Sequence, residues 1–179
     1  AEAWRKTEAF VGHHGGLDLD TGTATFFADA TPTGPMTDAR SLGIAGSAIA
    51  SLSIFKTVSF VDEQSVSQAY VGNNATVTAG SLTLQSTAQT TANADAKFVG
   101  ISGFLAGAVG EVYAGNRQGS LAYIGDDANV TLSGALNIHA SNTPSVTPNI
   151  SSVQVGAISV NVLSVISDLG SNAPNYKGT

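Results

Sequence analysis

Apolar and polar residues alternate along much of the chain, with the two-residue spacing that predicts β-strands buried on one face. The alternation is clearest at residues 51–54 (SLSI), 75–79 (ATVTA), 82–84 (LTL) and 160–162 (VNV). We expect the apolar side chains of each stretch to point inward and the polar side chains to point outward. The strands predicted in this way are about five residues long.

Short polar segments separate these strands. Residues 72–74 (GNN) and 125–127 (GDD) join glycine to residues that tolerate a left-handed backbone and can hydrogen-bond within their own turn. They predict tight corners between strands.

The chain repeats itself. Residues 69–79 (AYVGNNATVTA) match residues 122–132 (AYIGDDANVTL) at an offset of 53, and residues 80–85 (GSLTLQ) match residues 134–139 (GALNIH) after a one-residue insertion. Residues 16–20 (GLDLD) are interpreted as a degenerate copy of this Gly-x-Leu-x-Leu element. Such a period predicts stacked units that bury a shared apolar column.

Looser motifs at residues 42–44, 99–101 and 155–157 each open a segment rich in Ala, Gly and Ser. They divide the chain into a degenerate leading repeat or insertion (1–41), two repeat units (42–98 and 99–154) and a partial unit (155–179). The predicted fold is therefore all-β: a parallel β-solenoid, specifically a right-handed β-helix, of about three imperfect units of about 55 residues. With short strands, each unit would form about three coils of roughly 18 residues.

The small-residue segments leave an alternative open. Residues 103–107 (GFLAG) also fit a helix laid against the sheet. The apolar stretches at 42–55 and 98–109 are interrupted by Gly and Ser, so no stretch reaches the roughly 18 apolar residues that a membrane helix needs. Because the chain opens without a Met and stops in mid-pattern, we interpret it as an excerpt of a longer protein.

Composition narrows the class of protein. Only 11% of residues are charged and the formal net charge is −6, which argues against a nucleic-acid partner because phosphate binding needs clustered Lys and Arg. The absence of cysteine excludes disulfides and thiolate metal sites. A surface covered by Ser, Thr, Asn, Gln and Gly is typical of β-rich extracellular proteins.

The unit AYVG-NN-ATVTAG-SLTLQS, followed by an Ala/Gly/Val-rich segment, resembles the repeats of giant bacterial surface adhesins of the filamentous-haemagglutinin-like and leukotoxin-like kind. The resemblance covers residues 42–179. It implies a rod-like secreted or cell-surface protein with an adhesive or matrix role and no catalytic residues. Residues 1–41 depart from the pattern, notably in the loop at residues 32–35 (PTGP).

Histidines and carboxylates are the candidate site residues. His13 and His14 are adjacent, so on a strand their side chains point to opposite faces and a shared metal is disfavoured. Asp18 and Asp20 share a face and would suit Ca²⁺ or a catalytic pair, but nothing basic lies near them in sequence. His139 is interpreted as a solvated position equivalent to Gln85 and Asp20.

The remaining motifs are interpreted as structural. Asp126-Asp127 replaces Asn73-Asn74 at a corner, and the sequons at Asn74, Asn129 and Asn149 are attributed to chance in a Thr-rich chain. No Gly-x-Ser-x-Gly element is present, and Gly110, Gly115 and Gly119 form no phosphate-binding fingerprint. We therefore assign no catalytic, cofactor-binding or metal-binding residue and expect no cofactor.

The functional hypothesis is a structural or adhesive segment of a large secreted or cell-surface bacterial repeat protein, which self-assembles into an extracellular fibre or binds glycans or proteins of a host or cell surface. It is not expected to be an enzyme. The alternatives are a carbohydrate-active β-helix enzyme (lyase or hydrolase) and, below it, an ice-binding solenoid, for which the Thr-x-Thr ladder at residues 23–25, 76–78 and 129–131 is broken.

Overall fold

The computed structural model describes residues 1–62 and 64–170, which form fourteen strands and no helix. The strands are β1 (Glu2–Ala3), β2 (Lys6–Val11), β3 (Gly16–Asp18), β4 (Thr23–Ala30), β5 (Thr37–Ser47), β6 (Ala50–Val61), β7 (Val66–Val71), β8 (Thr76–Ala79), β9 (Ser81–Ser102), β10 (Leu105–Asn116), β11 (Gly119–Ile124), β12 (Asn129–Leu132), β13 (Leu136–Val155) and β14 (Ile158–Leu169).

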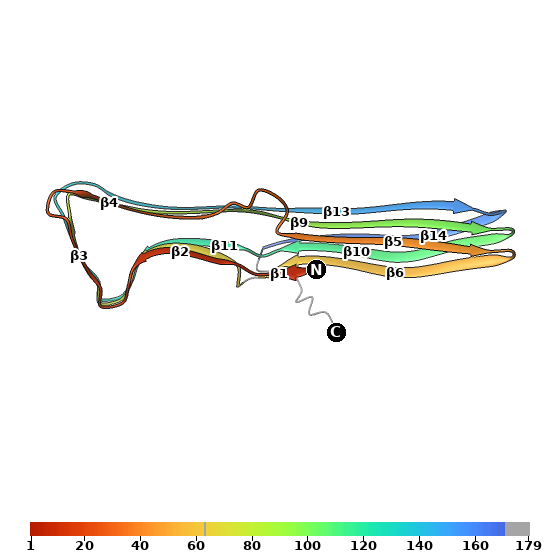
Figure 1. The fold of residues 1–179 in the computed structure, drawn as a ribbon, viewed down its shortest axis with the longest axis horizontal. Coiled ribbons are helices and arrows are strands. Elements are labelled where there is room, and N and C mark those ends of the chain that lie inside the picture. The colour runs from red at the N-terminus through yellow and green to blue at the C-terminus, as the bar shows by residue number, and fades with distance from the viewer. Residues whose placement is uncertain (63, 171–179) are drawn as a thin grey trace.

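All strand pairs are parallel and fall into four sheets. Sheet A has the order β1-β6-β10-β14, sheet B β11-β7-β2 and sheet C β12-β8-β3; sheet D has the order β13-β9-β4, with β5 pairing farther along β9. The chain visits sheets B, C, D and A in turn and then begins again (Figure 1). The protein is therefore all-β with parallel sheets, an architecture consistent with a parallel β-solenoid.

One sequence repeat makes one pass through the four sheets. Lys6 pairs with Val66, and Val66 pairs in turn with Gly119, so each strand of sheet B lies beside its counterpart in the next repeat. Ala50 pairs with Leu105 in the same way on sheet A. The expectation of several short coils per unit is therefore wrong. Strands are long rather than short because the pattern of small residues continues without a corner through β9, which runs for 22 residues.

The close sequence repeat is also the strand register. Tyr70 pairs with Tyr123, Val77 with Val130, and Leu82 with Leu136 after the one-residue insertion. These pairings confirm that equivalent residues of successive copies stack on one another.

The predicted alignment of the looser motifs at residues 42–44, 99–101 and 155–157 is wrong. Gly43 pairs with Phe98, two residues before Gly100. A two-residue slip keeps every side chain on its own face, so the alternation alone does not exclude it. The interpretation of residues 16–20 as a copy of the Gly-x-Leu-x-Leu element is also wrong. Leu17 pairs with Val77 of β8, so these residues match the strand that precedes that element. The residue that pairs with Leu82 is Ala24.

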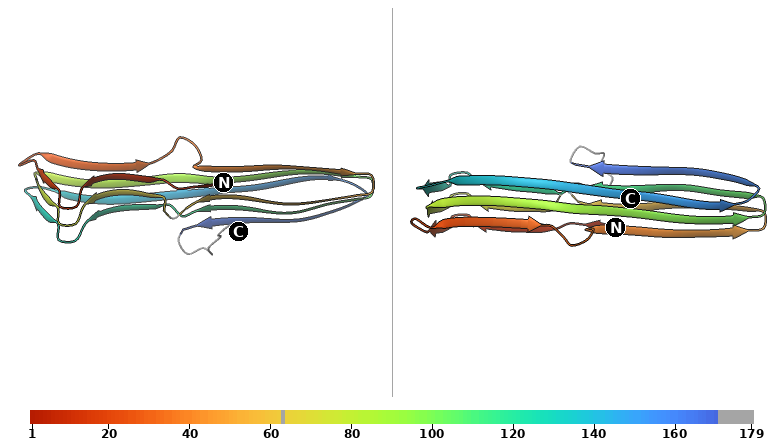
Figure 2. Two further views of the ribbon diagram at one scale, coloured as in Figure 1. Left: turned by 60° about the horizontal axis from the view of Figure 1, so that its bottom comes forward. Right: turned by 90° about the horizontal axis from the view of Figure 1, so that it is seen from above.

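The molecule is elongated, with a broad end and a flat arm (Figures 1 and 2). At the broad end, sheets B and C and the start of sheet D surround an interior. Along the arm, β5, β9 and β13 form one layer and β6, β10 and β14 form the other. Each pass turns at the far end of the arm between the two layers, for example between β9 and β10. Residues 103–104 are this turn, so the helix alternative for residues 103–107 is wrong.

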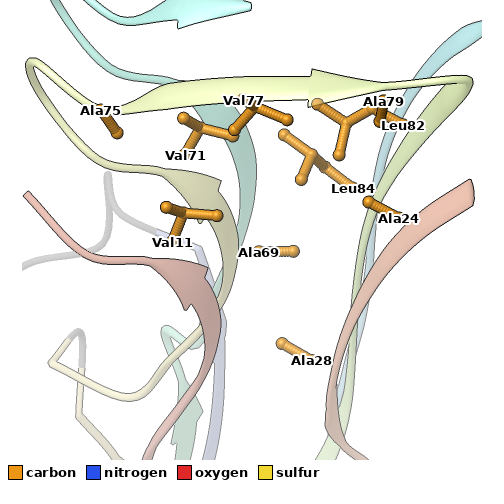
Figure 3. Packing of buried hydrophobic residues seen from close by; sticks show 10 residues of the cluster. All are labelled: Val11, Ala24, Ala28, Ala69, Val71, Ala75, Val77, Ala79, Leu82 and Leu84. Carbon is orange, nitrogen blue, oxygen red and sulfur yellow. The ribbon is translucent and has the colours of Figure 1, made fainter. Parts of the chain in front are cut away.

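The broad end contains the larger apolar core. Side chains from β2, β4, β7, β8 and β9 point into it (Figure 3). Its buried members are Val11, Ala24, Ala28, Ala69, Val71, Ala75, Val77, Ala79, Leu82 and Leu84. Here the expected rule holds, because the apolar residue of each alternating pair is inside.

On sheet A near the end of the arm the rule is reversed. Ser51 is only 7% exposed, whereas its neighbour Leu52 is 66% exposed. Between the two layers of the arm, alanines at positions 92, 94 and 96 of β9 and 106, 108 and 114 of β10 are fully or almost fully buried, together with Phe98 and Val112. The large aliphatic side chains of β6 and β14 near the end of the arm, such as Ile54 and Val162, lie on the outer face instead.

Residues 6–30 take part in the stack through β2, β3 and β4. Ala30 pairs with Ala88, and Thr37 pairs with Ala92, so the chain takes a longer path between these positions than its neighbour does. The loop at residues 32–35 is thus a short insertion within one strand path. No helix capable of spanning a membrane occurs in the described part of the chain.

Candidate interaction surface

The outer face of sheet A near the end of the arm is aliphatic. We call this surface the tip face. Leu52 and Ile54 come from β6, Leu105 and Val109 from β10, and Ile158, Val160 and Val162 from β14, and all are exposed. Their inward neighbours in sequence, such as Ser51 and Ala108, are buried. The alternation that predicts strands therefore places the large residues on the surface.

The tip face has both protruding side chains and hollows. Ile54, Val109 and Val162 form one row across the three strands, and Leu52, Gly107 and Val160 form the next. Because Gly107 has no side chain, a hollow of about 280 Å³ lies between the flanking aliphatic groups. A second hollow of about 420 Å³ lies farther from the end, beside Gly110.

The end of the arm is without charge. Residues 41–55, 98–110 and 150–167 include no Asp, Glu, Lys or Arg. The first charged pair on sheet A is Lys56 and Glu111, whose Nζ and Oε1 atoms lie 3.3 Å apart. The opposite face, on sheet D, also exposes aliphatic groups, among them Ile44 and Val153, and the turns expose Ile49 and Phe104.

An aromatic ladder lies on the outside of sheet B. The rings of Phe10, Tyr70 and Tyr123 are stacked in register, with both centroid distances at 5.1 Å and interplanar angles of 5° and 2°. Tyr70 is only 8% exposed because its neighbours cover both faces of its ring. Burial is also the main reason that its pKa is raised above the usual value. Stacking covers both faces of the Tyr70 ring and leaves its edge, whereas Phe10 and Tyr123, at the two ends, are each stacked on one face.

The corners form a second ladder. His14, Asn74 and Asp127 all have left-handed backbone angles, with φ of 57°, 55° and 56°. The Asn73 backbone N–H donates to Nδ1 of His13 at 3.0 Å, and the Asp126 N–H donates to Oδ1 of Asn73 at 3.1 Å. Each corner side chain therefore caps the backbone of the next pass.

These corners account for two of the sequence motifs. The left-handed corners predicted at residues 72–74 and 125–127 are confirmed at Asn74 and Asp127, and the His13-His14 pair is the same corner in the first pass. No group of three or more potential metal ligands occurs within the described residues.

A buried ionic cluster lies where the arm meets the broad end. The Tyr113 hydroxyl donates to Oδ2 of Asp168 at 2.5 Å, and Nη2 of Arg117 lies 3.1 Å from the same oxygen. The Arg117 and Asp168 side chains are each 4% exposed, and the guanidinium lies 5.3 Å from the centre of the Phe60 ring. Burial, followed by the hydrogen bond to Asp168, raises the pKa of Tyr113 to about 12.

A neighbouring amide connects three strands. Nδ2 of Asn116 donates to the carbonyl oxygens of Thr90 at 2.8 Å and Ser145 at 3.1 Å. Asn116 is fully buried, and its bonds join β10 to β9 and β13. Such satisfied buried polar groups rigidify a structure and help to fix the register of its strands.

The carboxylates considered as sites have local structural roles. Asp20 has a left-handed backbone, and its N–H donates to Oδ1 of Asp18 at 3.2 Å in a turn.

His139 pairs with Gln85 as expected, but the third member of this row is Phe27 and not Asp20. Thr76 pairs with Asn129 and Gly16, so the threonine ladder required for ice binding is broken as predicted.

Sequence reasoning did not find the tip face or the buried cluster. The alternation at residues 51–54 is visible, but nothing local indicates which side of a strand faces the other layer. Tyr113 and Arg117 lie on a different pass from Asp168, far from it in sequence. Only the register of β10 with β14 brings them together.

No known protein family, curated protein or solved structure matches this chain.

Proposed function

We propose that the chain is a structural or adhesive segment of a large secreted or cell-surface bacterial repeat protein, built as a right-handed β-solenoid of about three imperfect units. The proposal rests on the sequence resemblance to surface-adhesin repeats and on the stacked arrangement of the chain. In this role the segment extends a rod and exposes long, flat faces to partners.

The observation that carries the proposal is the set of ladders that run from pass to pass. The aromatic stack, the corner hydrogen bonds and the apolar column each repeat along one direction. Two of these ladders end, on the last described pass, on a group able to receive one more member: the outer face of the Tyr123 ring and the Asp126 carboxylate. A structure that grows by repetition in one direction is suited to a rod.

The sheet edges support the same conclusion. Within the described chain, β6 along the arm and β14 have neighbours on one side only. Their outer edges therefore present unpaired backbone groups that favour the addition of a further strand. Stacking of copies into an extracellular fibre uses these edges.

Partner binding would use the exposed faces. The outer positions of β9 from Thr83 to Asn93 are Thr, Gln and Asn, and those of β13 from Asn137 to Thr147 are of similar type apart from His139. A flat face rich in hydroxyl and amide groups is suited to hydrogen-bonding glycans or proteins on a host or cell surface. The low count of basic residues disfavours nucleic acid.

Electron microscopy and fibre diffraction of the native full-length protein test the proposal. We expect rods at the bacterial surface, with a repeat of about 4.8 Å along the rod axis because that is the spacing between stacked strands. Compact particles without this repeat, or labelling of the protein only inside intact cells, would contradict the proposed function.

A further inference from the structure

We propose that the loop between β4 and β5 forms a binding site for a neutral oligosaccharide on the outer face of sheet D. This site rests on the proposed function, because it gives the partner binding proposed there one class of ligand and one place. It comprises a pocket between residues 31–35 and β9, which we call the loop pocket, and the exposed ring of Phe27 on the same face.

The loop pocket exists because the first pass takes a longer path than its neighbour. Seven residue steps lead from Ala30 to Thr37. Only four lead from Ala88 to Ala92, which are their partners on β9. The three additional residues lift the chain out of its layer between β4 and β5 (Figures 1 and 2). Residues 89–91 therefore have a paired strand on the β13 side only.

The loop sequence keeps this gap from closing by strand pairing. Pro32 and Pro35 have no backbone N–H, so neither can donate a hydrogen bond to β9. Pairing resumes where the N–H of Met36 donates to the carbonyl oxygen of Thr91 at 2.8 Å. The space left between loop and strand is about 320 Å³, at the lower end of the range for small-molecule sites.

The lining of the loop pocket suits a ligand with many hydroxyl groups. Residues 31–35 form its wall, and Gln89 and Thr91 of β9 contribute the rest. Threonine hydroxyls and a glutamine amide both donate and accept hydrogen bonds, as the hydroxyl groups of a sugar do. The two proline rings of the wall offer apolar surface to the C–H groups of a sugar ring. This mixture of apolar surface and a few polar groups is typical of ligand sites.

The charges around the loop pocket favour a neutral ligand. No Asp, Glu, Lys or Arg lines it. The Thr31 hydroxyl donates to Oδ1 of Asp29, just before the loop. This bond orients the hydroxyl and leaves its oxygen able to accept a hydrogen bond from a ligand. The negative charge of Asp29 disfavours an anionic sugar at the same place.

An exposed aromatic ring extends the site along β4. Phe27 is 52% exposed on the outer face and pairs with Gln85 of β9. It precedes Thr31 by four residues, which is about 13 Å at the usual rise of a strand. A ring at this separation suits stacking against another sugar unit of the same ligand. The site is therefore proposed for a short oligosaccharide rather than a single sugar.

Titration calorimetry and saturation-transfer NMR with neutral trisaccharides of glucose, galactose and mannose test the site, with sialyllactose as the anionic comparison. The variant Gln89→Ala/Thr91→Ala removes the polar side chains that β9 contributes. The matched control, Asn137→Ala/Thr147→Ala, removes one amide and one hydroxyl from the outer face of β13, away from the loop pocket. At least one neutral trisaccharide should bind, at least tenfold more weakly to the first variant and nearly unchanged to the control.

A deletion keeps the proposal testable if the substituted variant does not fold. Removal of residues 33–35 gives the first pass the same path length as β9 between Ala88 and Ala92, so it closes the loop pocket without interrupting the stack. This variant should keep the circular dichroism spectrum and thermal unfolding of the unmodified chain and lose trisaccharide binding. Phe27→Ala should weaken binding several-fold without abolishing it.

Three results would overturn the site: no binding of any neutral trisaccharide, tighter binding of sialyllactose, or equal binding by the unmodified chain and the folded pocket variants. Native rods together with any of these results would leave the proposed function intact. The absence of rods would contradict the proposed function, whereas trisaccharide binding that only the pocket variants lose would still support the site.

Discussion

Tyr113 is held in its neutral form by its surroundings. Its hydroxyl donates to Asp168 within a nearly closed site, and burial together with this bond raises its pKa from 10.0 to about 12. As pH rises from 10 to 12, the unfolded chain loses this proton before the folded protein does. The contribution of Tyr113 to stability is therefore complete below the unfolded-state pKa and is lost as pH rises through the folded-state pKa.

Replacing Tyr113 by Phe should lower the free energy of unfolding by about 1–3 kcal/mol at neutral pH, because Asp168 loses a buried hydrogen bond. Urea unfolding at pH values from 7 to about 11.5 measures this. The alkaline decrease in stability should be smaller in Tyr113→Phe than in the unmodified protein. The control is Tyr123→Phe, since the Tyr123 ring lies at one end of the aromatic ladder and is 38% exposed. An identical pH profile for Tyr113→Phe would contradict this role.

Asn74 is constrained by its backbone, with φ at 55°. A β-branched residue is strained in this conformation, so Asn74→Val should cost about 1–2 kcal/mol. Asn74→Gly should change stability much less, because glycine adopts the conformation freely. Thermal unfolding of the two variants measures the difference. Equal effects would indicate that the side chain, rather than the backbone angle, is what the corner needs.

The structural roles of single residues were partly predictable from the sequence. Corner residues were found because Asn-Asn and Asp-Asp after glycine have a local chemical reason to turn, and the same reason extends to His13-His14 once it is aligned with them. Tyr113 and Asp168 were missed because no local signal relates two residues on separate passes. A histidine pair that looks like a metal site proved to be a corner whose Nδ1 atom caps the next backbone.

At the scale of elements, close stacking of passes depends on glycines that lie against the backbone of a neighbouring pass, and Gly80 has the shortest such approach. A Cβ atom at Gly80 would lie 2.1 Å from the carbonyl oxygen of Thr21, which belongs to the backbone of the preceding pass. Because backbone cannot move aside as a side chain can, Gly80→Ala should cost about 1–3 kcal/mol. Gly16→Ala is the matched control, since nothing lies within 4 Å of its added Cβ.

Chemical denaturation of the Gly80→Ala and Gly16→Ala variants tests the stacking directly. A large loss for the first and a small change for the second is expected. If both variants were equally stable, the contact between successive corners at Thr21 and Gly80 would not exist in solution.

The alternation of apolar and polar residues predicted where strands occur. It did not predict how long they are or which of their faces is buried. At residues 75–79 and 82–84 the apolar residues are inside, as expected. At residues 51–54 and 160–162 the aliphatic residues are outside. Alternation identifies two faces of a strand, and only the partner layer decides which of them is buried.

At the scale of the whole molecule, the close repeat predicted the stacking direction and the parallel pairing. The offset of 53 between residues 69–79 and 122–132 became the spacing between β7 and β11. The number of passes per repeat was not predictable, because a short coil and a pass as long as the whole repeat share the same alternation of apolar and polar positions. For the same reason, the predicted alignment of residues 42–44 with residues 99–101 differs by two residues from the observed strand register.

The central claim is that one repeat makes one pass, which places Thr87 beside Ser141 on the outer face of sheet D. In a chain without cysteine, Thr87→Cys/Ser141→Cys introduces two thiols at these paired positions. The comparison variant Thr87→Cys/Leu105→Cys introduces two thiols that only an arrangement of short coils would bring together. Under mild oxidation at low protein concentration, we expect an intramolecular disulfide in the first variant and none in the second. A disulfide in the second variant and none in the first would contradict the account.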